Sequence, residues 1–431
     1  MGQFSKIVSS QRAFFKTSAT RPLEKRKELL VNLSKMVNDH LDDVVVAYRK
    51  DLGRGRGAAL FEKANVDARI AYTIDNLEAW AAPTPLPVVA PLNKEEDDLV
   101  LVKESLGVVL NIAPWNGPLT SMASNMYPLA AGNTVIFKPS ELAPAIASLW
   151  SRIVPLYFDP NVLTVVTGGV PETTELLTER FDHIFYTGST GVAKIIMGAA
   201  AKNLTPVTLE LGGKNPVFID DTADIPHTVA RLLMAKSFGA SQVCICPDYL
   251  LVTPKAKSAL IAELNKQIPS LPDLKTADTY GKIVHEGAFD RLAGLLSASK
   301  GTIVAKSEGQ LDRATRFFPI HVVECPDMFG PIYPLHEVGD IDEAIDIIHG
   351  KEKPLAAYIF TGEKAVAEKF VERTWTGGVT VNDVMAHCST MEAPFGGVGS
   401  SGIGRIMGKY GFDAFTHEKA VAVRKGLKAH F

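Results

Sequence analysis

Apolar residues follow helical spacing in the first long patterned stretch of the chain, residues 22–52. They form one stripe, which consists of Leu29, Leu30, Leu33, Met36, Val37, Leu41, Val44 and Val45. Gly53 follows this stripe, and glycine is common just beyond the last residue of a helix. The pattern predicts helical structure up to a glycine cap at Gly53.

From about residue 106 the pattern changes to short runs rich in β-branched and aromatic residues. The first series consists of LGVVLNIA (106–113), NTVIFK (133–138), VLTVVT (162–167), HIFYT (183–187) and PVTLEL (206–211). Helix-like stretches, such as 141–154 and 191–203, lie between these runs. Strands that alternate with helices indicate a parallel sheet with helices on both faces.

A second series of the same kind follows a boundary near residues 210–215. Its β-rich runs are 216–220, 249–254, 356–361 and 377–383, with helical patterns at 342–350 and 364–374. The proline-rich segment APTPLPVVAPL (82–92) belongs to neither series. We expect it to be a linker or an arm that leaves one domain.

Composition places the chain among soluble globular proteins of two or three domains, with 431 residues, 46% hydrophobic and 22% charged. A net charge of −3 gives no reason to expect a nucleic-acid partner. The four cysteines are unevenly spaced, which does not suggest a disulfide framework and favours a reducing compartment. No apolar run approaches the length of a membrane span, and no secretory signal is present. We therefore expect a cytoplasmic protein.

Polar residues stand where several predicted strands of the first series end. They are Asn116, Lys138, Thr187, Ser189 and Glu210. In open parallel sheets, ligands bind beyond the carboxyl ends of the strands, where helix N-termini point their amides. We expect these side chains to meet at one edge of the sheet.

Cys244 and Cys246 form a pair in the segment SQVCICPDY (241–249). A metal site built from cysteines generally needs a two-residue spacer and further ligands, so none is expected here. A disulfide across one residue would be strained. Two alternatives remain on the residues alone: buried packing of both side chains, or a catalytic nucleophile with a neighbour.

Eight motifs in one order make the chain resemble the aldehyde dehydrogenase superfamily, most closely its class-3-like branch of fatty and aromatic aldehyde dehydrogenases. They are PWNGP (114–118), IFKPSELAP (136–144), YTGSTGVAK (186–194), TLELGGKNPVFI (208–219), SQVCICPDY, FGPIYPL (329–335), KPLAAYIFT (353–361) and APFGGVGSSGIG (393–404). The likeness extends from about residue 10 to about 424.

The resemblance implies the roles of three catalytic residues. Cys244 is the nucleophile, whose thiolate adds to the aldehyde carbon and later leaves from a thioester. Glu210 is the general base for the hydrolytic water, and Asn116 donates to the developing oxyanion together with the Cys244 amide. Cys246 matches a position without a catalytic role, and the alternative for Glu210 is an ion pair with Lys214.

The resemblance also implies a bound NAD, with NADP as an alternative. The expected contacts with the cofactor come from Lys138, Glu141, Ser189, Gly188, Trp115, Asp327 and Phe329. Glu141 should favour NAD because its carboxylate would face the ribose 2′-hydroxyl. Phe395 and Gly117 are expected to line the substrate tunnel, with core packing as the alternative for Phe395.

Several positions depart from the family pattern. Asp327 replaces a glutamate that holds the nicotinamide ribose, and the segment before it is shorter. Gly117 replaces an aromatic residue, and Ser241 stands where glycine is common. These departures motivate an alternative function, a cysteine-dependent isomerase or esterase on the same fold, or impaired cofactor use. Residues 397–402 spell GxGxxG, but no strand precedes them in a βαβ unit, so we expect a loop.

The predicted architecture is therefore an α/β, aldehyde dehydrogenase-like fold with three parts. These are a Rossmann-type cofactor domain (1–82 and 102–210), an α/β catalytic domain (211–383), and an oligomerisation arm with the active-site loop (83–101 and 384–431). The resemblance implies an aldehyde substrate and a homodimer, with the arm and the strand near 419–425 as contact elements.

Overall fold

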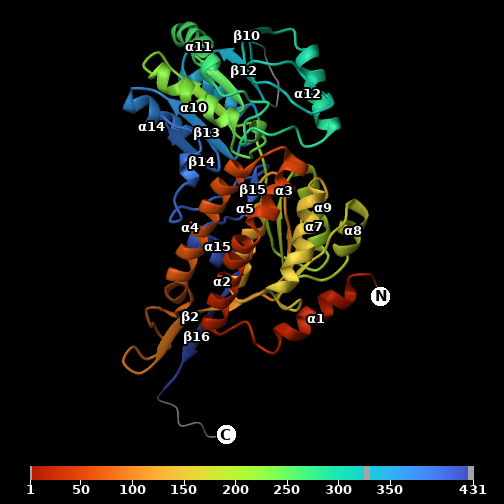
Figure 1. The fold of residues 1–431 in the computed structure, drawn as a ribbon. Helices are drawn as coiled ribbons and strands as arrows, with labels where there is room; N and C mark the ends of the chain where they lie inside the picture. The colour runs from red at the N-terminus through yellow and green to blue at the C-terminus, as the bar shows by residue number, and fades with distance from the viewer. Residues whose placement is uncertain (1, 325–330, 426–431) are drawn as a thin grey trace.

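The computed structural model describes residues 2–324 and 331–425, and it places most of the strands in two large sheets. Each sheet forms the centre of one lobe, and a narrow arm projects from the lower lobe (Figure 1). The predicted α/β architecture with strands and helices in alternation is confirmed.

The lower lobe contains a six-stranded sheet in the order β15-β7-β6-β3-β4-β5. All neighbours are parallel except β15, which runs antiparallel to β7. The strands are β3 (Val108–Ile112), β4 (Thr134–Lys138), β5 (Leu163–Val165), β6 (His183–Thr187), β7 (Val207–Glu210) and β15 (Gly402–Ile403). Five of the six were predicted from the first series of runs, and β15 was not.

Helices cover both faces of this sheet because alternate side chains of its strands are apolar on both sides. Val109 of β3 lies in one core cluster, whereas Val108 and Leu110 lie in the other. Burying each such side chain contributes roughly 1.5–3 kcal/mol. The first cluster takes side chains from α2 (Leu23–Asp39), α3 (Leu41–Leu52), α4 (Arg56–Ala81), α5 (Pro118–Ala123), α6 (Met126–Ala130), α7 (Pro144–Ile153) and α15 (Gly408–Ala414), and the second from α1 (Ser5–Phe15), α8 (Val170–Leu176) and α9 (Thr190–Ala201).

The predicted helical stretch 22–52 is present as two helices rather than one. His40 separates α2 from α3 with φ −115° and ψ 21°, outside the helical region. Asp42 and Asp43 then occupy the first turn of α3, where negative charge favours a new helix N-terminus. The predicted cap is confirmed, because Gly53 ends α3 with φ 69°.

The upper lobe contains a seven-stranded sheet in the order β10-β11-β12-β9-β8-β13-β14. Only the edge strand β10 is antiparallel to its neighbour. The strands are β8 (Pro216–Ile219), β9 (Tyr249–Val252), β10 (Thr302–Lys306), β11 (His321–Glu324), β12 (Ile332–Glu337), β13 (Ala356–Phe360) and β14 (Gly378–Val381). The sequence pattern predicted β8, β9, β13 and β14 but not β10, β11 and β12.

Five longer helices accompany this second sheet. They are α10 (Ile225–Ser237), α11 (Pro254–Gln267), α12 (Glu286–Ala298), α13 (Ile341–His349) and α14 (Lys364–Arg373). Short 3-10 turns connect other elements, namely η1 (Val154–Leu156), η2 (Gly239–Ser241), η3 (Ile268–Ser270) and η4 (Ala386–Cys388). The turn η2 directly precedes the segment that carries the two neighbouring cysteines.

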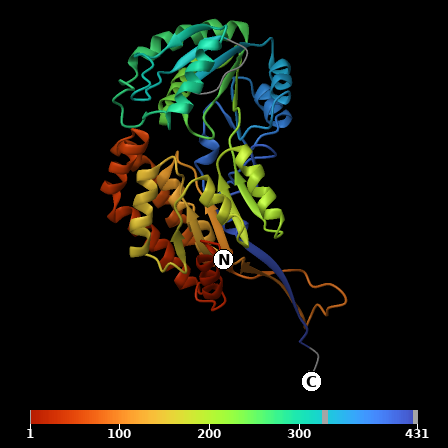
Figure 2. The ribbon, with the colours of Figure 1, turned by 90° about the vertical axis from the view of Figure 1, so that its right-hand side faces the viewer.

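The arm is a three-stranded antiparallel sheet of β1 (Thr84–Pro85), β2 (Asp98–Ser105) and β16 (Thr416–Val423). Figure 2 shows it extending away from the body of the protein. β16 pairs with β2 along eight residues, although the two strands are far apart in sequence. The functional assignment of the three parts and their boundaries stay predictions.

Candidate active site

The three predicted catalytic residues come from different elements near the junction of the lobes. Asn116 follows β3, Glu210 is the last residue of β7, and Cys244 lies shortly after η2. The Asn116 side-chain nitrogen donates to the Gln242 carbonyl at 2.8 Å, two residues before Cys244. The carboxylate of Glu210 acts electrostatically on the Cys244 thiol. The structure thus brings the three residues together.

Glu210 is almost fully buried, with 3% of its surface exposed. Neither carboxyl oxygen has a hydrogen-bond partner among the described residues. Burial raises the pKa of this carboxyl group well above its ordinary value near 4.5. Lys214, its alternative partner, instead places its Nζ 3.2 Å from Asp248 Oδ2. A buried carboxyl group with free oxygens and a raised pKa has the properties of a general base.

The backbone around Glu210 is fixed from two sides. Gly402 of β15 pairs with it on one side. The Gly188 amide, at the end of β6, donates to the Glu210 carbonyl at 3.0 Å. These contacts hold the carboxyl group at the edge of the sheet. The predicted loop at residues 397–402 is therefore present up to its last residue, which enters β15.

Cys244 and Cys246 have different surroundings. Cys244 is half-buried, and burial, with the nearby Glu210 and Cys388, raises its pKa to about 12. Cys246 is 5% exposed and packs in the core of the upper lobe, with its Sγ 3.7 Å from the Ala235 carbonyl. The packing expected for Cys246 is present. The Cys244 thiol is protonated at neutral pH, so it needs a proton acceptor before it can attack.

The segment before Cys244 is strained. Ala240 and Ser241 have φ values of 49° and 65°, in the left-handed region that costs L-residues roughly 1–2 kcal/mol. Gln242 opposes this strain: its side chain donates to the carbonyls of Gly239 and Lys282 and accepts from the Val284 amide, each at 3.0 Å.

Beyond Cys244, the Asn215 side chain donates to the carbonyls of Cys244 and Cys246, each at 2.9 Å. Neither Gln242 nor Asn215 was predicted as a site residue. Both stand inside quoted motifs, which was the only signal for them in the sequence.

The residues expected to bind the cofactor lie around the carboxyl ends of β4 and β6. Lys138 ends β4 and is buried, and its Nζ lies 2.9 Å from Glu141 Oε2. Burial opposes ionisation of Glu141, but hydrogen bonds from Lys138 and from its own amide leave its pKa below the ordinary value. Ser189 caps α9 by accepting from the Val192 amide at 3.4 Å. A lysine, a helix N-terminus and an ionised carboxylate are two donors and one acceptor, a set that fits the phosphates and ribose hydroxyls of a dinucleotide.

Gly188 cannot carry a side chain, because a Cβ there would lie 2.1 Å from the Tyr186 hydroxyl. The same hydroxyl accepts from the Ser189 amide at 2.8 Å. Trp115 is half-buried and packs against the core cluster of the lower lobe. Asp327 and Phe329 lie outside the described residues.

The two expected tunnel residues lie beside the catalytic residues in different ways. Phe395 is half-buried and packs with Cys244 against one core cluster. Its ring is parallel to that of His387, with centroids 6.5 Å apart. Gly117 precedes α5, and a Cβ there would meet Glu62 Oε2 at 3.6 Å, an ordinary contact. The backbone at Gly117 therefore leaves room for the Cβ of a larger residue.

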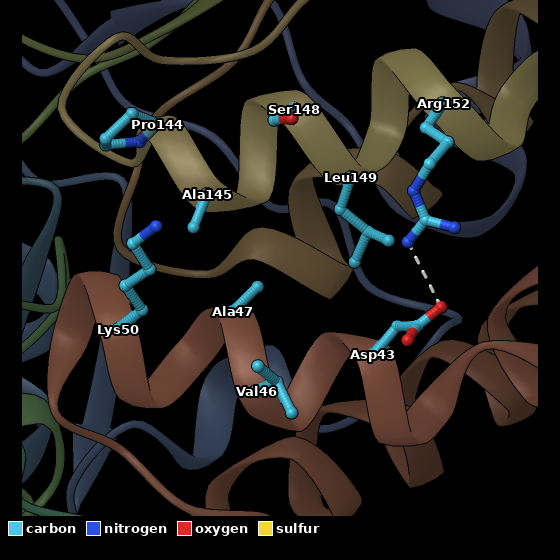
Figure 3. A pocket seen from close by; sticks show the side chains of 9 residues that line it. All are labelled: Asp43, Val46, Ala47, Lys50, Pro144, Ala145, Ser148, Leu149 and Arg152. Carbon is cyan, nitrogen blue, oxygen red and sulfur yellow. Dashed lines mark hydrogen bonds and ion pairs between the residues drawn. The ribbon is translucent and has the colours of Figure 1, made fainter.

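A surface cavity of about 360 Å³ lies elsewhere, between α3 and α7 (Figure 3). Asp43 and Arg152 face each other across it, with an Nη2–Oδ2 distance of 3.2 Å. None of the three predicted catalytic residues lines this cavity. It is separate from the candidate active site.

A model of the aldehyde dehydrogenase family matches residues 2–421. The chain belongs to the aldehyde dehydrogenase family. The predicted resemblance, fold class and enzyme class are thereby confirmed: the protein is an aldehyde dehydrogenase, which oxidises an aldehyde to a carboxylic acid with NAD(P).

Two curated relatives and one solved structure match this aldehyde dehydrogenase over nearly its whole length. It is 40% identical to the mouse protein "Aldehyde dehydrogenase, dimeric NADP-preferring", covering 98% of the chain and 95% of that protein. It is 38% identical to "Aldehyde dehydrogenase family 3 member A2" of Macaca fascicularis, covering 98% and 88%. A substrate-bound structure of Staphylococcus aureus AldH superposes with a TM-score of 0.94 at 34% identity, covering 100% and 96%.

Within residues 2–324 and 331–425, no helix of this aldehyde dehydrogenase is long and apolar enough to cross a membrane. The same residues contain no cluster of His, Cys, Asp and Glu suited to a metal ion.

Proposed function

We propose that this aldehyde dehydrogenase oxidises aliphatic or aromatic aldehydes through a covalent intermediate on Cys244. The observation that carries this proposal is the buried carboxyl group of Glu210, which has no hydrogen-bond partner among the described residues and acts on the Cys244 thiol. A structural carboxyl group so deeply buried would be expected to have a partner. A carboxylate whose oxygens have no such partner is suited to take a proton from the Cys244 thiol or from water.

Four steps follow from the positions of these groups. The Cys244 thiol gives its proton to the Glu210 carboxylate, which passes it to solvent, and the sulfur bonds to the aldehyde carbon while the carbonyl electron pair moves to the oxygen. The resulting oxyanion accepts hydrogen bonds from the Asn116 side chain and the Cys244 amide. NAD(P), which Lys138, Glu141 and Ser189 would hold, would supply the acceptor for the hydride of this carbon, and Cys244 is then left with a thioester. Glu210 then takes a proton from water, the hydroxide oxygen adds to the thioester carbon, and the sulfur leaves.

Asn116 has the hydrogens that this role needs. A side-chain amide carries two N–H groups, and the bond to the Gln242 carbonyl uses one of them. The second is free to meet the oxyanion. The Gln242 carbonyl is an acceptor, so the nitrogen end of the Asn116 amide, and not its oxygen, must face it. This bond therefore fixes the orientation of the amide.

We further propose that Lys138, Glu141, Gly188, Ser189 and Trp115 hold the cofactor, and that NAD is preferred to NADP. The ionised Glu141 carboxylate, held by Lys138, supports this because it would repel a 2′-phosphate. Phe395 and Gly117 would shape the substrate path. Asp327 and Phe329 remain predicted contacts.

A homodimer and a cytoplasmic location complete the proposal. One relative is named as dimeric, and the exposed edge of β16 offers a strand for pairing. Cys244, Cys246 and Cys388 are free thiols, as expected in a reducing compartment.

The decisive experiment replaces Cys244 with Ala and measures reduced cofactor formation with medium-chain and aromatic aldehydes. We expect turnover to fall by at least about 10⁴-fold, as for other covalent nucleophiles. Cys246→Ala is the matched control, because this thiol is buried in the core, and we expect its activity to change by less than about 3-fold. Persistent turnover in the Cys244 variant would exclude it as the nucleophile. Cys244-dependent reaction without cofactor reduction would indicate the isomerase or esterase alternative.

A further inference from the structure

A buried ionic cluster contacts the loop that carries Asn116. It consists of Tyr48 of α3, Arg54 in the turn after α3, and Glu62 of α4, which are 0%, 1% and 6% exposed. Arg54 Nη1 lies 3.9 Å from Glu62 Oε1, and the Tyr48 hydroxyl is hydrogen-bonded to the Glu62 carboxylate. Burial lowers the pKa of Arg54 and raises that of Glu62. Such a cluster is costly to bury, and hydrophobic residues of similar size would often be as stable.

Arg54 contacts both loops that are proposed to bind the oxyanion. Its Nη1 donates to the Asn116 carbonyl at 2.7 Å. Its guanidinium also lies over the Phe238 ring, with the central carbon 5.6 Å from the ring centroid. Phe238 precedes η2 and the loop that carries Cys244. One side chain therefore connects the Asn116 loop to the Cys244 loop.

Two glycines make room for this side chain. A Cβ on Gly239 would lie 2.4 Å from Arg54 Nη2, and a Cβ on Gly281 would lie 2.8 Å from Arg54 Cγ. Both glycines have positive φ, 62° and 77°, which other residues rarely adopt. The loops are thus shaped around the guanidinium.

Glu62 and Tyr48 hold the other end of the Asn116 loop. Glu62 Oε2 accepts from the Thr120 amide at 3.3 Å, and the Tyr48 hydroxyl accepts from the Leu119 amide at 3.2 Å. Arg54 thus holds the carbonyl of Asn116, while its two partners hold the amides that follow. The loop is fixed on both sides of the Asn116 side chain.

We infer that Arg54 is a positioning residue for the oxidation, which orients the Asn116 amide and ties it to the Cys244 loop, with Glu62 and Tyr48 keeping the guanidinium in place. This inference rests on the proposed role of Asn116. On this inference, the buried Arg54 guanidinium serves to orient the Asn116 side-chain N–H toward the oxyanion, rather than to stabilise the fold.

The test is a double-mutant cycle on kcat and KM with Arg54→Met, Asn116→Ala and the double variant. We expect Asn116→Ala to lower kcat about 10²–10³-fold, as for other oxyanion donors. Arg54→Met should lower kcat about 10–100-fold. The affinity for the cofactor NAD should stay unchanged. The double variant should be no more than about 3-fold worse than Asn116→Ala alone, because Arg54 acts through Asn116. Arg152→Met is the control, because this arginine pairs with Asp43 at the surface, 61% exposed.

Each outcome of the cycle decides one question. If Asn116→Ala leaves kcat intact, the proposed oxyanion role fails, and the inference fails with it. If Asn116→Ala is impaired but the two losses multiply in the double variant, the oxyanion role stands and the positioning role of Arg54 is overturned.

Arg54→Met leaves Glu62 buried without its cation and could prevent folding. In that case Arg54→Met is combined with Glu62→Gln, which removes the stranded charge, and the same cycle is repeated. Full activity in the folded Arg54→Met/Glu62→Gln protein would overturn the inference.

Discussion

Glu210 is held in surroundings that oppose its ionisation, and this has consequences for both rate and stability. Its carboxyl oxygens lack partners among the described residues, and burial raises its pKa well above 4.5. Between pH 4.5 and that raised pKa, the folded protein holds a proton that the unfolded chain has released. Stability therefore falls as pH rises through this window.

We expect Glu210→Gln to be more stable than the unaltered protein at pH 8–9 and equal to it below pH 4.5. The gain is about 1.4 kcal/mol for each unit by which folding raises the pKa of the carboxyl group. Thermal unfolding of both proteins across this pH range measures it. In the same variant, the rise of kcat with pH should disappear, because no carboxylate remains to take the proton from water. A variant destabilised at pH 8 would mean that the carboxylate has a stabilising partner.

Ser241 is one of the positions that depart from the expected family pattern, and its backbone conformation predicts the effect of this departure on stability. Its φ of 65° suits glycine, the residue that the resemblance led us to expect at this position. We expect Ser241→Gly to stabilise the protein by about 0.5–1 kcal/mol, after the greater flexibility of glycine in the unfolded chain is subtracted. Denaturant unfolding measures this gain, and Ser258→Gly in the interior of α11 is a contrasting control that should destabilise. A loss of stability in Ser241→Gly would show that the side chain contributes more than the strain costs.

At the level of elements, the turn between β4 and α7 carries the proposed choice between cofactors. Lys138 Nζ lies 2.9 Å from the ionised carboxylate of Glu141 there. We expect Glu141→Gln to raise kcat/KM for NADP relative to NAD about 10-fold, because the variant removes a negative charge from the 2′ position, worth about 1.4 kcal/mol. Steady-state rates with both cofactors at fixed aldehyde measure the ratio. An unchanged ratio would place the discrimination on another residue.

The elements differ in how far their sequence predicts them. β3, β4 and β6 are buried on both faces and consist mostly of apolar residues, which local pattern detects. β10 is largely exposed, with a single fully buried residue in TIVAK, and its signal is therefore weak. The break at His40 was missed because α2 and α3 pack one continuous apolar stripe into the same core.

The residues of the candidate site also differ in how far the sequence predicts them. The grouping of Cys244, Glu210 and Asn116 was predictable because they stand in long motifs, and their catalytic roles stay predictions. Arg54 was not, since its partner Asn116 is 62 residues away. A lone arginine in a glycine-rich turn has the pattern of a solvated loop, and only the folded chain shows that it is buried.

At the scale of the whole molecule, the arm is the sheet with the most exposed side chains. β16 has one free edge among the described strands, and its side chains are mostly exposed. We expect the protein to be a dimer in light scattering, and removal of residues 416–431 to convert it to a monomer. Lys419→Ala is the control, because its ion pair with Glu104 is exposed and contributes about 0–1 kcal/mol. A truncated protein that stays dimeric would place the interface elsewhere.

The pairing of Gly402 with Glu210 also bears on how the enzyme is made. The two residues are 192 positions apart (402 minus 210), so at about 5–20 residues per second the ribosome needs about 10–40 s to add the second after the first. During that interval β7, which carries Glu210, lacks its neighbour on one edge. Glu210, the proposed base, therefore reaches its final position only late in synthesis, and we expect a nascent chain that already contains Cys244 to be inactive.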